Sequence, residues 1–484
     1  MSTPDFFRAR LDAMIDMNHP LVILAKRLPW SEIEAVLGPY FSRQPLKGQS
    51  VAINDLLDRD LQIAGTDGAI SNRGRPRLSI RLMAGLLYLK HAYNESDEAL
   101  VERWAQDVYY QYFCGMAYFE PRLPCDATQV GRFRQRIGEA GAAELLARTI
   151  NTAVSLKAIK PAELETIIVD STVQEKAIAH PTDSRLMDVA RRKLVQLARQ
   201  AGISLKQTFE KEGKTLCRKA GGYAHARQFN RLHKVVRRQR TILGKLMREI
   251  RRKMSGLPEG IQTKLTLWLD RSQRIATQQK KDGNKLYALH APEVECISKG
   301  KVRKRYEFGV KVSLAVTHKK GLIVGAKSIP GNPYDGHTLA EQIEQTTILL
   351  LDQNVVPKTA YVDLGYRSTE DSVPSVNVIH RGKMKSLTKQ QRRGLKRRQA
   401  IEPTIGHVKQ DHGMQRCWLK GELGDAVHAI LCAAGFNIRW LLRAIVRLRR
   451  KAYLAFIFLL RYLQSHRGSH ALASIPHTTS LSDT

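Results

Sequence analysis

The chain has 484 residues, more than one compact domain usually fills, so we expect two or three structural units. Its hydrophobic fraction of 43% is ordinary for a globular protein and is sufficient for a sizeable core. The charge balance is unusual, because 79 Lys and Arg stand against 45 Asp and Glu, which gives a net charge of +34. A surplus of this size repels itself unless the partner is a polyanion, and this favours a nucleic acid.

The sequence argues against the competing partner, an anionic membrane. Its nearest candidate for a spanning helix, residues 452–460, is shorter than the about 20 apolar residues required, and basic residues flank it. No secretory signal opens the chain. The cysteines are scattered without a C-x-x-C pair, which fits a reducing cytosol. We therefore expect a cytoplasmic protein with no membrane partner, and we interpret all six cysteines as core residues: Cys114, Cys125, Cys217, Cys296, Cys417 and Cys432.

Residues 1–140 are predicted to form a helical domain. Apolar residues recur at helical spacing in 30–41 and 78–93, and Ser96 and Asp126 are good N-caps for two further helices. Short helices joined by tight turns, the last one basic, are compatible with a helix-turn-helix that reads the DNA major groove. A helical bundle with solvated arginines explains the pattern equally well. The candidate DNA contacts on the last helix are Arg132, Arg134 and Arg136.

The segment Arg73-Gly74-Arg75-Pro76-Arg77 precedes these helices. Arginines in an extended chain of this kind can lie in a narrow, A·T-rich minor groove, where the potential is most negative. A basic linker with no groove preference is the alternative, and we favour it for sequence recognition. For contact with phosphates, Arg73 and Arg75 remain candidates.

From residue 165 the pattern predicts a mixed α/β sheet. An apolar, β-branched run at 166–169 ends at Asp170, and two strand-like runs, 306–316 and 322–329, are joined by a polar turn. A helix is expected to about residue 351, followed by a strand over 359–362 that ends at Asp363 and by another over 376–380. This order of elements places carboxylates at strand ends.

A basic insertion separates the first two predicted strands. Residues 185–254 contain 21 Lys and Arg but only 4 Asp and Glu. Apolar residues from Phe229 to Ile250 follow helical spacing, so we expect a long amphipathic helix that pairs with 186–197 as a helical hairpin. A charged helix face is usually only solvated, but so strong an imbalance favours contact with DNA through residues such as Arg237 and Arg238.

Asp170 and Asp363 each follow an apolar strand (IIVD and AYVD) in a chain that is otherwise basic. If the two strands are neighbours, the carboxylates converge, and two converging anions need a cation between them. Hard oxygen ligands suit Mg²⁺ or Mn²⁺, whereas the His and Cys spacing of a zinc site is absent. Either Asp alone is explained as well by a structural role at a strand end.

A third acid strengthens this interpretation. Arg398, Glu402 and Lys409 fall within about 40° of one helical face, which would combine a carboxylate for a metal with cations for phosphate. Pro403 prevents one helix from running through this segment from Leu395. We therefore expect Pro403 at the first helical position and Glu402 at the cap.

At this point the sequence resembles the DDE transposases of bacterial insertion sequences, in the group named after insertion sequence five. The group's signature is Tyr-(2)-Arg-(3)-Glu-(6)-Lys, and Arg398, Glu402 and Lys409 match its last three positions, while Leu395 stands in place of the Tyr. Several ordered blocks add to the likeness, which runs from about residue 15 to 445. These blocks are DST at 170–172, YEFGVK at 306–311, GNPYDGH at 331–337, VDLGY at 362–366, RLMAGLLYLK at 81–90 and CAAGFNI at 432–438.

The resemblance implies a ribonuclease-H-like catalytic domain, residues 141–450, with a basic helical insertion at about 185–256 and a tail at 451–484. It also implies that Asp170, Asp363 and Glu402 bind two Mg²⁺ or Mn²⁺ ions, supported by Arg398 and Lys409. The expected function is binding of the inverted-repeat ends of an insertion sequence in double-stranded DNA, followed by strand cleavage and strand transfer, by a homodimer at the bacterial nucleoid. A plain nuclease and a catalytically silent DNA-binding relative are the alternatives.

The block Tyr334-Asp335-Gly336-His337 is less decisive. Asp335 and His337 are close in sequence to a predicted helix start, and a turn explains the block better than metal binding does. We treat His337 as an accessory residue near the metals. The aromatic residues Tyr306, Phe308 and Trp418 suit stacking on flipped bases, but a place in the core is the more common role.

Overall fold

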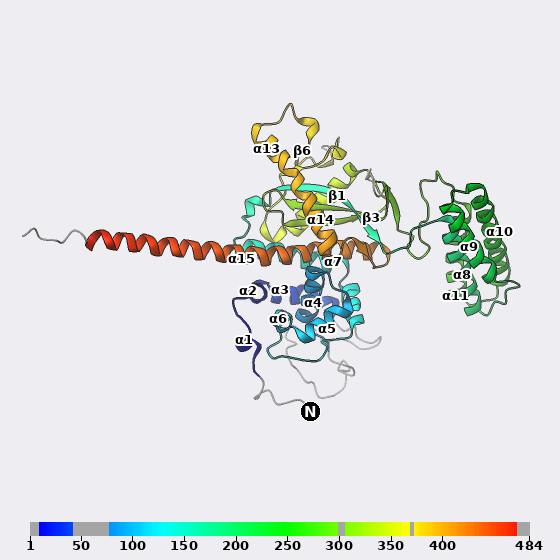
Figure 1. The fold of residues 1–484 in the computed structure, drawn as a ribbon, viewed down its shortest axis with the longest axis horizontal. Helices are drawn as coiled ribbons and strands as arrows, with labels where there is room; N and C mark the ends of the chain where they lie inside the picture. The colour runs from blue at the N-terminus through cyan, green and yellow to red at the C-terminus, as the bar shows by residue number, and fades with distance from the viewer. Residues whose placement is uncertain (1–8, 42–76, 299–304, 368–371, 472–484) are drawn as a thin grey trace, which may run out of the picture.

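The computed structural model describes residues 9–41, 77–298, 305–367 and 372–471, with the backbone alone for 459–471 (Figure 1). Arg73 and Arg75 therefore lie outside the described residues. The fold is a mixed α/β sheet flanked by helices, with a separate helical unit inserted after the first strand. The mixed sheet predicted from the sequence is confirmed.

The N-terminal part is helical. Ser96 accepts a hydrogen bond from Ala99 N and Asp126 accepts one from Thr128 N, so both predicted N-caps are confirmed. The last helix is longer than expected and bends at Gly138, whose φ of 60° is costly for residues with a side chain. The helices are α1 (Leu11–Met14), α2 (Pro20–Arg27), α3 (Trp30–Leu37), α4 (Ile80–Tyr93), α5 (Asp97–Gln106), α6 (Val108–Phe113) and α7 (Ala127–Ser155).

The sheet has seven strands in the order β2-β3-β1-β5-β6, with β4 paired to β3 and β7 to β1. The long central pair β1–β3 is antiparallel, whereas β5 and β7 run parallel to β1. The strands are β1 (Thr166–Lys176), β2 (Glu295–Ser298), β3 (Tyr306–Thr317), β4 (Ile323–Ile329), β5 (Thr359–Tyr361), β6 (Asn377–Ile379) and β7 (Arg416–Cys417). Every strand predicted from the sequence is present, and the two that were missed, β2 and β7, are short.

Helix α15 (Gly421–Ala471) is the scaffold of the molecule. It runs between the sheet and the N-terminal helices and packs on β4, α4 and α7 (Figure 1). Phe436 and Trp440 are buried, as predicted. We expected a tail from residue 451, but α15 continues to Ala471. This prediction is therefore wrong for residues 451–471. Among the described helices, the stretch Gly421–Phe458 is the one long and apolar enough to cross a membrane, but 78% of its most apolar window is buried, as in a core helix.

The basic insertion is a four-helix unit rather than the predicted hairpin, and it extends to Thr277 instead of ending near residue 256. In Figure 1 it lies to one side of the sheet. It has its own core, which includes Leu194, Leu243 and Leu269, whereas Phe229 is 56% exposed and not part of the apolar face. The helices are α8 (Asp183–Gln200), α9 (Glu210–His225), α10 (Phe229–Lys253) and α11 (Glu259–Thr277).

Two side-chain amides satisfy the outer backbone groups of β4. Asn437 on α15 accepts a hydrogen bond from Ile323 N (3.0 Å) and donates one to Ile323 O (2.8 Å). Gln345 on α12 (Leu339–Leu349) pairs in the same way with the backbone of Ala326. Because unpaired strand edges recruit other strands, these amides both fix the helices to the sheet and close its edge.

We predict that Asn437→Ala destabilises the protein by about 2–3 kcal/mol, because it leaves the buried N–H and C=O of Ile323 without partners. Gln345→Ala should cost less, since its site is partly open to water. Denaturant unfolding followed by circular dichroism measures both, and Glu344→Ala, an exposed neighbour on α12, is the control. Equal losses for Asn437→Ala and Glu344→Ala would contradict the assignment.

Candidate active site

The register of β1 and β5 brings two of the predicted acids together. The strands pair in parallel through Ile167–Ala360 and Ile168–Tyr361, so Asp170 and Asp363 both stand two residues beyond the last pair. The prediction that their strands are neighbours is confirmed. Asp170 does not end its strand, however, because β3 continues to pair with β1 as far as Glu175.

Glu402 reaches the site on α14 (Ile401–Asp411), which packs against β1. It follows α13 (Lys389–Arg397) and a single 3₁₀ turn, Arg398–Ala400. The predicted cap is wrong by two residues: Ala400 is the N-cap, Glu402 is the second residue of α14 and Pro403 is the third. Proline is tolerated there because N–H groups in the first turn have no partner within the helix.

The guanidinium of Arg398 lies among all three acids. One of its nitrogens, Nη1, is 3.4 Å from Asp170 Oδ2, and the other, Nη2, is 3.9 Å from Asp363 Oδ1 and 3.8 Å from Glu402 Oε1. The Arg398 side chain is 9% exposed, whereas those of Asp170, Asp363 and Glu402 are 21%, 52% and 63% exposed. One buried cation thus faces three carboxylates that become progressively more open to water.

The donor set suits a hard divalent ion. Carboxylate oxygens are the ligands that Mg²⁺ and Mn²⁺ prefer, and three acids facing one arginine leave an excess of negative charge. The backbone N–H of Ser171 and that of Leu364 donate to Asp170 (2.8 Å) and Asp363 (2.7 Å), which orients both carboxylates. The acids gather around the guanidinium rather than around one empty point, so a bound ion would compete with Arg398 for them.

A network not predicted from the sequence adjoins Asp170. Asp335 Oδ1 accepts hydrogen bonds from Ser171 Oγ (2.8 Å) and from Lys311 Nζ (2.9 Å). Burial, with the Asp170 charge as a smaller cause, raises the pKa of Tyr366, so this phenol stays neutral beside the acids. The blocks containing these residues were noted in the sequence, but spacing gave no sign that they meet.

The two other accessory residues lie in the turn after β4 and on α14. His337 is exposed in a 3₁₀ turn, Asp335–Thr338, and packs against Tyr334 with ring centroids 5.8 Å apart, so the turn interpretation is confirmed. Lys409, on α14, lines a pocket of about 600 Å³ beside Trp418. Trp418 is 72% exposed and Tyr306 is 47% exposed, so the expectation that they are core residues is wrong.

The prediction that Arg134 on α7 contacts DNA is wrong. Arg134 is buried and forms a two-pronged ion pair with Asp97, at 3.0 and 3.3 Å, because its face of α7 packs on α5. Arg136 is exposed but donates to Tyr40 O and lies over the Phe41 ring. Arg132 is exposed and remains a candidate for DNA contact.

The two arginines of the insertion predicted to contact DNA, Arg237 and Arg238, also differ in their surroundings. Both lie on α10 and are exposed, but Arg238 forms a two-pronged ion pair with Glu212, at 2.6 and 3.0 Å. Arg237 stands beside it on the solvent side. The prediction that all six cysteines belong to the core is also wrong for Cys217 and Cys296, which are only partly buried.

Comparison with known proteins finds two family models that match parts of the chain. A model described as "Transposase domain (DUF772)" matches residues 44–136, and one described as "Transposase DDE domain" matches residues 369–442. Both matches support a DDE transposase. The DDE match includes Arg398, Glu402 and Lys409, and begins six residues after Asp363.

The chain also matches a curated protein of Rhizobium meliloti, named "Uncharacterized protein ORF8 in nfe locus". The two are 40% identical over 225 residues, which is 46% of this chain and 95% of that protein. No solved structure matches the chain significantly.

We predict that Arg134→Ala lowers the stability of the folded protein, whereas Arg132→Ala does not. Burial alone would raise the pKa of Asp97, but the Arg134 hydrogen bond and the Lys90 charge lower it, which shows how closely Asp97 depends on its cations. Loss of Arg134 should therefore destabilise the protein by about 2–3 kcal/mol. Arg132→Ala should leave thermal unfolding unchanged. Equal stability of the two variants would contradict the structural role of Arg134.

We also predict that Arg398→Gln tightens Mn²⁺ binding about tenfold, because it removes a competing charge less than 4 Å from the acids. Titration followed by electron paramagnetic resonance measures free Mn²⁺ directly. Arg393→Gln, an exposed arginine on α13, is the matched control for net charge. Weaker Mn²⁺ binding in Arg398→Gln than in this control would show that the guanidinium organises the acids rather than competing with the ion.

Proposed function

We propose that this protein is a transposase that binds the inverted-repeat ends of its insertion sequence and catalyses metal-dependent DNA cleavage and strand transfer. The observation that carries the proposal is the meeting of Asp170, Asp363 and Glu402 around one guanidinium. The acids come from two neighbouring strands and one helix, 193 and 39 positions apart in the chain. The arrangement supports a ribonuclease-H-like catalytic domain, which we assign to residues 141–450.

In this proposal the three acids hold two Mg²⁺ or Mn²⁺ ions. Bound ions of this kind activate water and stabilise the leaving oxygen of a phosphodiester. The chain's own groups orient the ligands: Ser171 N and Leu364 N hold the two aspartates, and α14 holds Glu402. Arg398, which faces all three acids, is positioned to neutralise charge beside a scissile phosphate.

The proposed DNA surface includes the basic insertion. The side chains that α10 exposes include Arg237, Arg240, Lys245 and Arg248, while its apolar face is buried in the core of the unit. Such a face binds phosphates without reading sequence. Recognition of the terminal repeat we assign to the N-terminal helical domain, with Arg132 as a contact. We propose that two copies act together on two DNA ends.

Cleavage of a labelled duplex tests the proposal. The duplex carries the inverted repeat from the DNA that flanks the gene, and Mn²⁺ is the metal. We predict that Asp363→Asn lowers cleavage at least 100-fold while binding of the duplex changes less than twofold. Asparagine keeps the oxygen that accepts from Leu364 N, so the fold should be preserved. Asp411→Asn, at an exposed aspartate on α14, is the control.

The outcomes distinguish the alternatives. Cleavage and joining by the wild type, lost in Asp363→Asn, support a transposase, whereas cleavage without joining indicates a nuclease. Binding without cleavage by the wild type indicates a silent relative. Cleavage by Asp363→Asn at the wild-type rate would place the active site elsewhere.

A further inference from the structure

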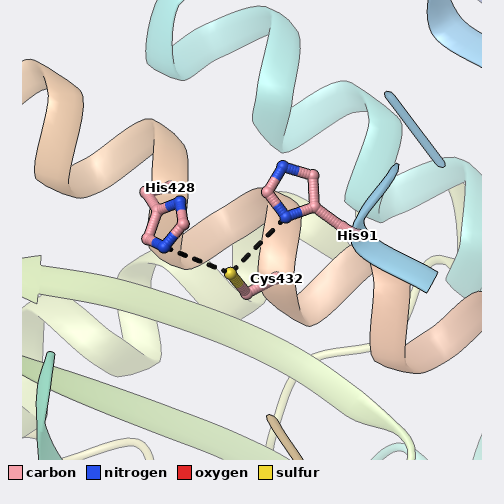
Figure 2. A group of neighbouring side chains, drawn as sticks. All are labelled: His91, His428 and Cys432. Carbon is pink, nitrogen blue, oxygen red and sulfur yellow. Dashed lines mark hydrogen bonds between the residues drawn. The ribbon is translucent and has the colours of Figure 1, made fainter. Parts of the chain in front are cut away.

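A second group of metal-binding residues lies outside the acidic site, in the interface between α4 and α15. His91, His428 and Cys432 are all buried, and one ligand atom from each lies within 4.8 Å of the others. In Figure 2 both imidazoles point at the Cys432 sulfur. His428 and Cys432 share a face of α15 because they are four residues apart, whereas His91 arrives on α4 from 341 positions away.

The two sulfur–nitrogen distances match those of a zinc site. Cys432 Sγ is 3.6 Å from His91 Nδ1 and 3.7 Å from His428 Nε2. Tetrahedral zinc binds nitrogen at about 2.0–2.1 Å and thiolate sulfur at about 2.3 Å, which places a nitrogen and a sulfur ligand about 3.6 Å apart. One thiolate with two imidazoles is also a ligand set that zinc accepts.

Hydrogen bonding is the alternative explanation of this convergence. Cys432 Sγ can donate to His91 Nδ1 and accept from the Nε2–H of His428, which also faces Gly413 O at 3.1 Å. Zinc would instead take the lone pairs of two neutral imidazoles and a thiolate, so the metal content of the protein decides between the two explanations.

We propose that His91, His428 and Cys432 bind a zinc ion that is distinct from the ions of the acidic site. Cys432 binds as the thiolate and releases one proton, and His428 moves its ring proton to Nδ1. Three protein ligands leave the fourth position of a tetrahedral ion for a water molecule, and His91 and His428 also line the pocket of about 600 Å³ described above. This assignment departs from the earlier interpretation of Cys432 as a plain core residue.

The ion would join two helices. His91 belongs to α4 and the other two ligands belong to α15, and the segment after α14 packs on α4 beside them, since His412 Nδ1 lies 2.8 Å from His91 O. His428 Nε2, 3.1 Å from Gly413 O, would exchange that contact for the ion. A Cβ at Gly435, near Cys432 on α15, would collide with the backbone of His91, so the two helices are in close contact here. The proposed role is structural: the ion fixes α15, on which the Glu402 helix α14 packs, to the N-terminal helices.

Metal analysis of the full-length protein tests the proposal. After growth with Zn²⁺ and purification without chelators, we expect about one zinc per chain by plasma mass spectrometry. Cys432→Ser should lose at least 80% of it, while Cys114→Ser, at another buried cysteine, should keep it. Asp363→Asn should also keep it, because the acidic site is separate. A strong zinc chelator should lower the melting temperature of the wild type by about 5 °C but not that of Cys432→Ser.

A spectroscopic measurement on the wild type tests the same site without relying on the folding of a variant. Co²⁺ added to the chelated wild type should produce a thiolate-to-cobalt charge-transfer band in the near ultraviolet and intense visible bands typical of tetrahedral cobalt. A wild type without zinc and without these bands would overturn the proposal. So would zinc retained in Cys432→Ser, or zinc lost in Asp363→Asn, since the ion would then belong to another site.

Discussion

The structure depends on holding three negative side chains together inside a strongly basic chain. Carboxylates that converge are stable only if a cation lies among them, and the Arg398 guanidinium takes that place at 3.4 to 3.9 Å. Arg398 and Glu402 are delivered by one short segment, a 3₁₀ turn followed by the first turn of α14, so the cation and one acid move as a unit. The other two acids depend on the register of β1 and β5, which a slip of one residue would destroy.

Helix α15 provides the rigidity that this arrangement needs. It contacts the sheet through Asn437, whose amide completes the hydrogen bonding of Ile323 on β4, and it contacts the N-terminal helices at His91 through Cys432. The same helix carries His428, so the proposed zinc ion would reinforce an interface that is already closely packed. The sheet and the N-terminal helices, which the sequence suggests are separate domains, therefore share one structural element.

Patterns along the chain were enough to predict the strands around Asp170 and Asp363 and the N-caps Ser96 and Asp126, because apolar periodicity and capping act over a few residues. Local pattern failed where distant contacts decide the outcome. Arg134 has the same sequence context as Arg132, and only the packing of α7 on α5 buries it against Asp97. Strands β2 and β7 are too short to show a period. Nothing in the sequence indicates that His91 and Cys432, which are 341 positions apart, lie side by side.

Strand β1 is longer than predicted, and its extension beyond Asp170 affects the proposed active site. Because β1 continues past Asp170, this acid lies between the segments of β1 that pair with β5 and with β7, and α14 packs against the strand there. Asp170 is accordingly the least exposed of the three acids and the nearest to Arg398. Its desolvated charge needs the guanidinium most, whereas Asp363 and Glu402 remain open to water. In the proposed mechanism, ions and the DNA phosphate therefore approach from the side of Asp363 and Glu402, and Asp170 with Arg398 forms the fixed inner wall of the site.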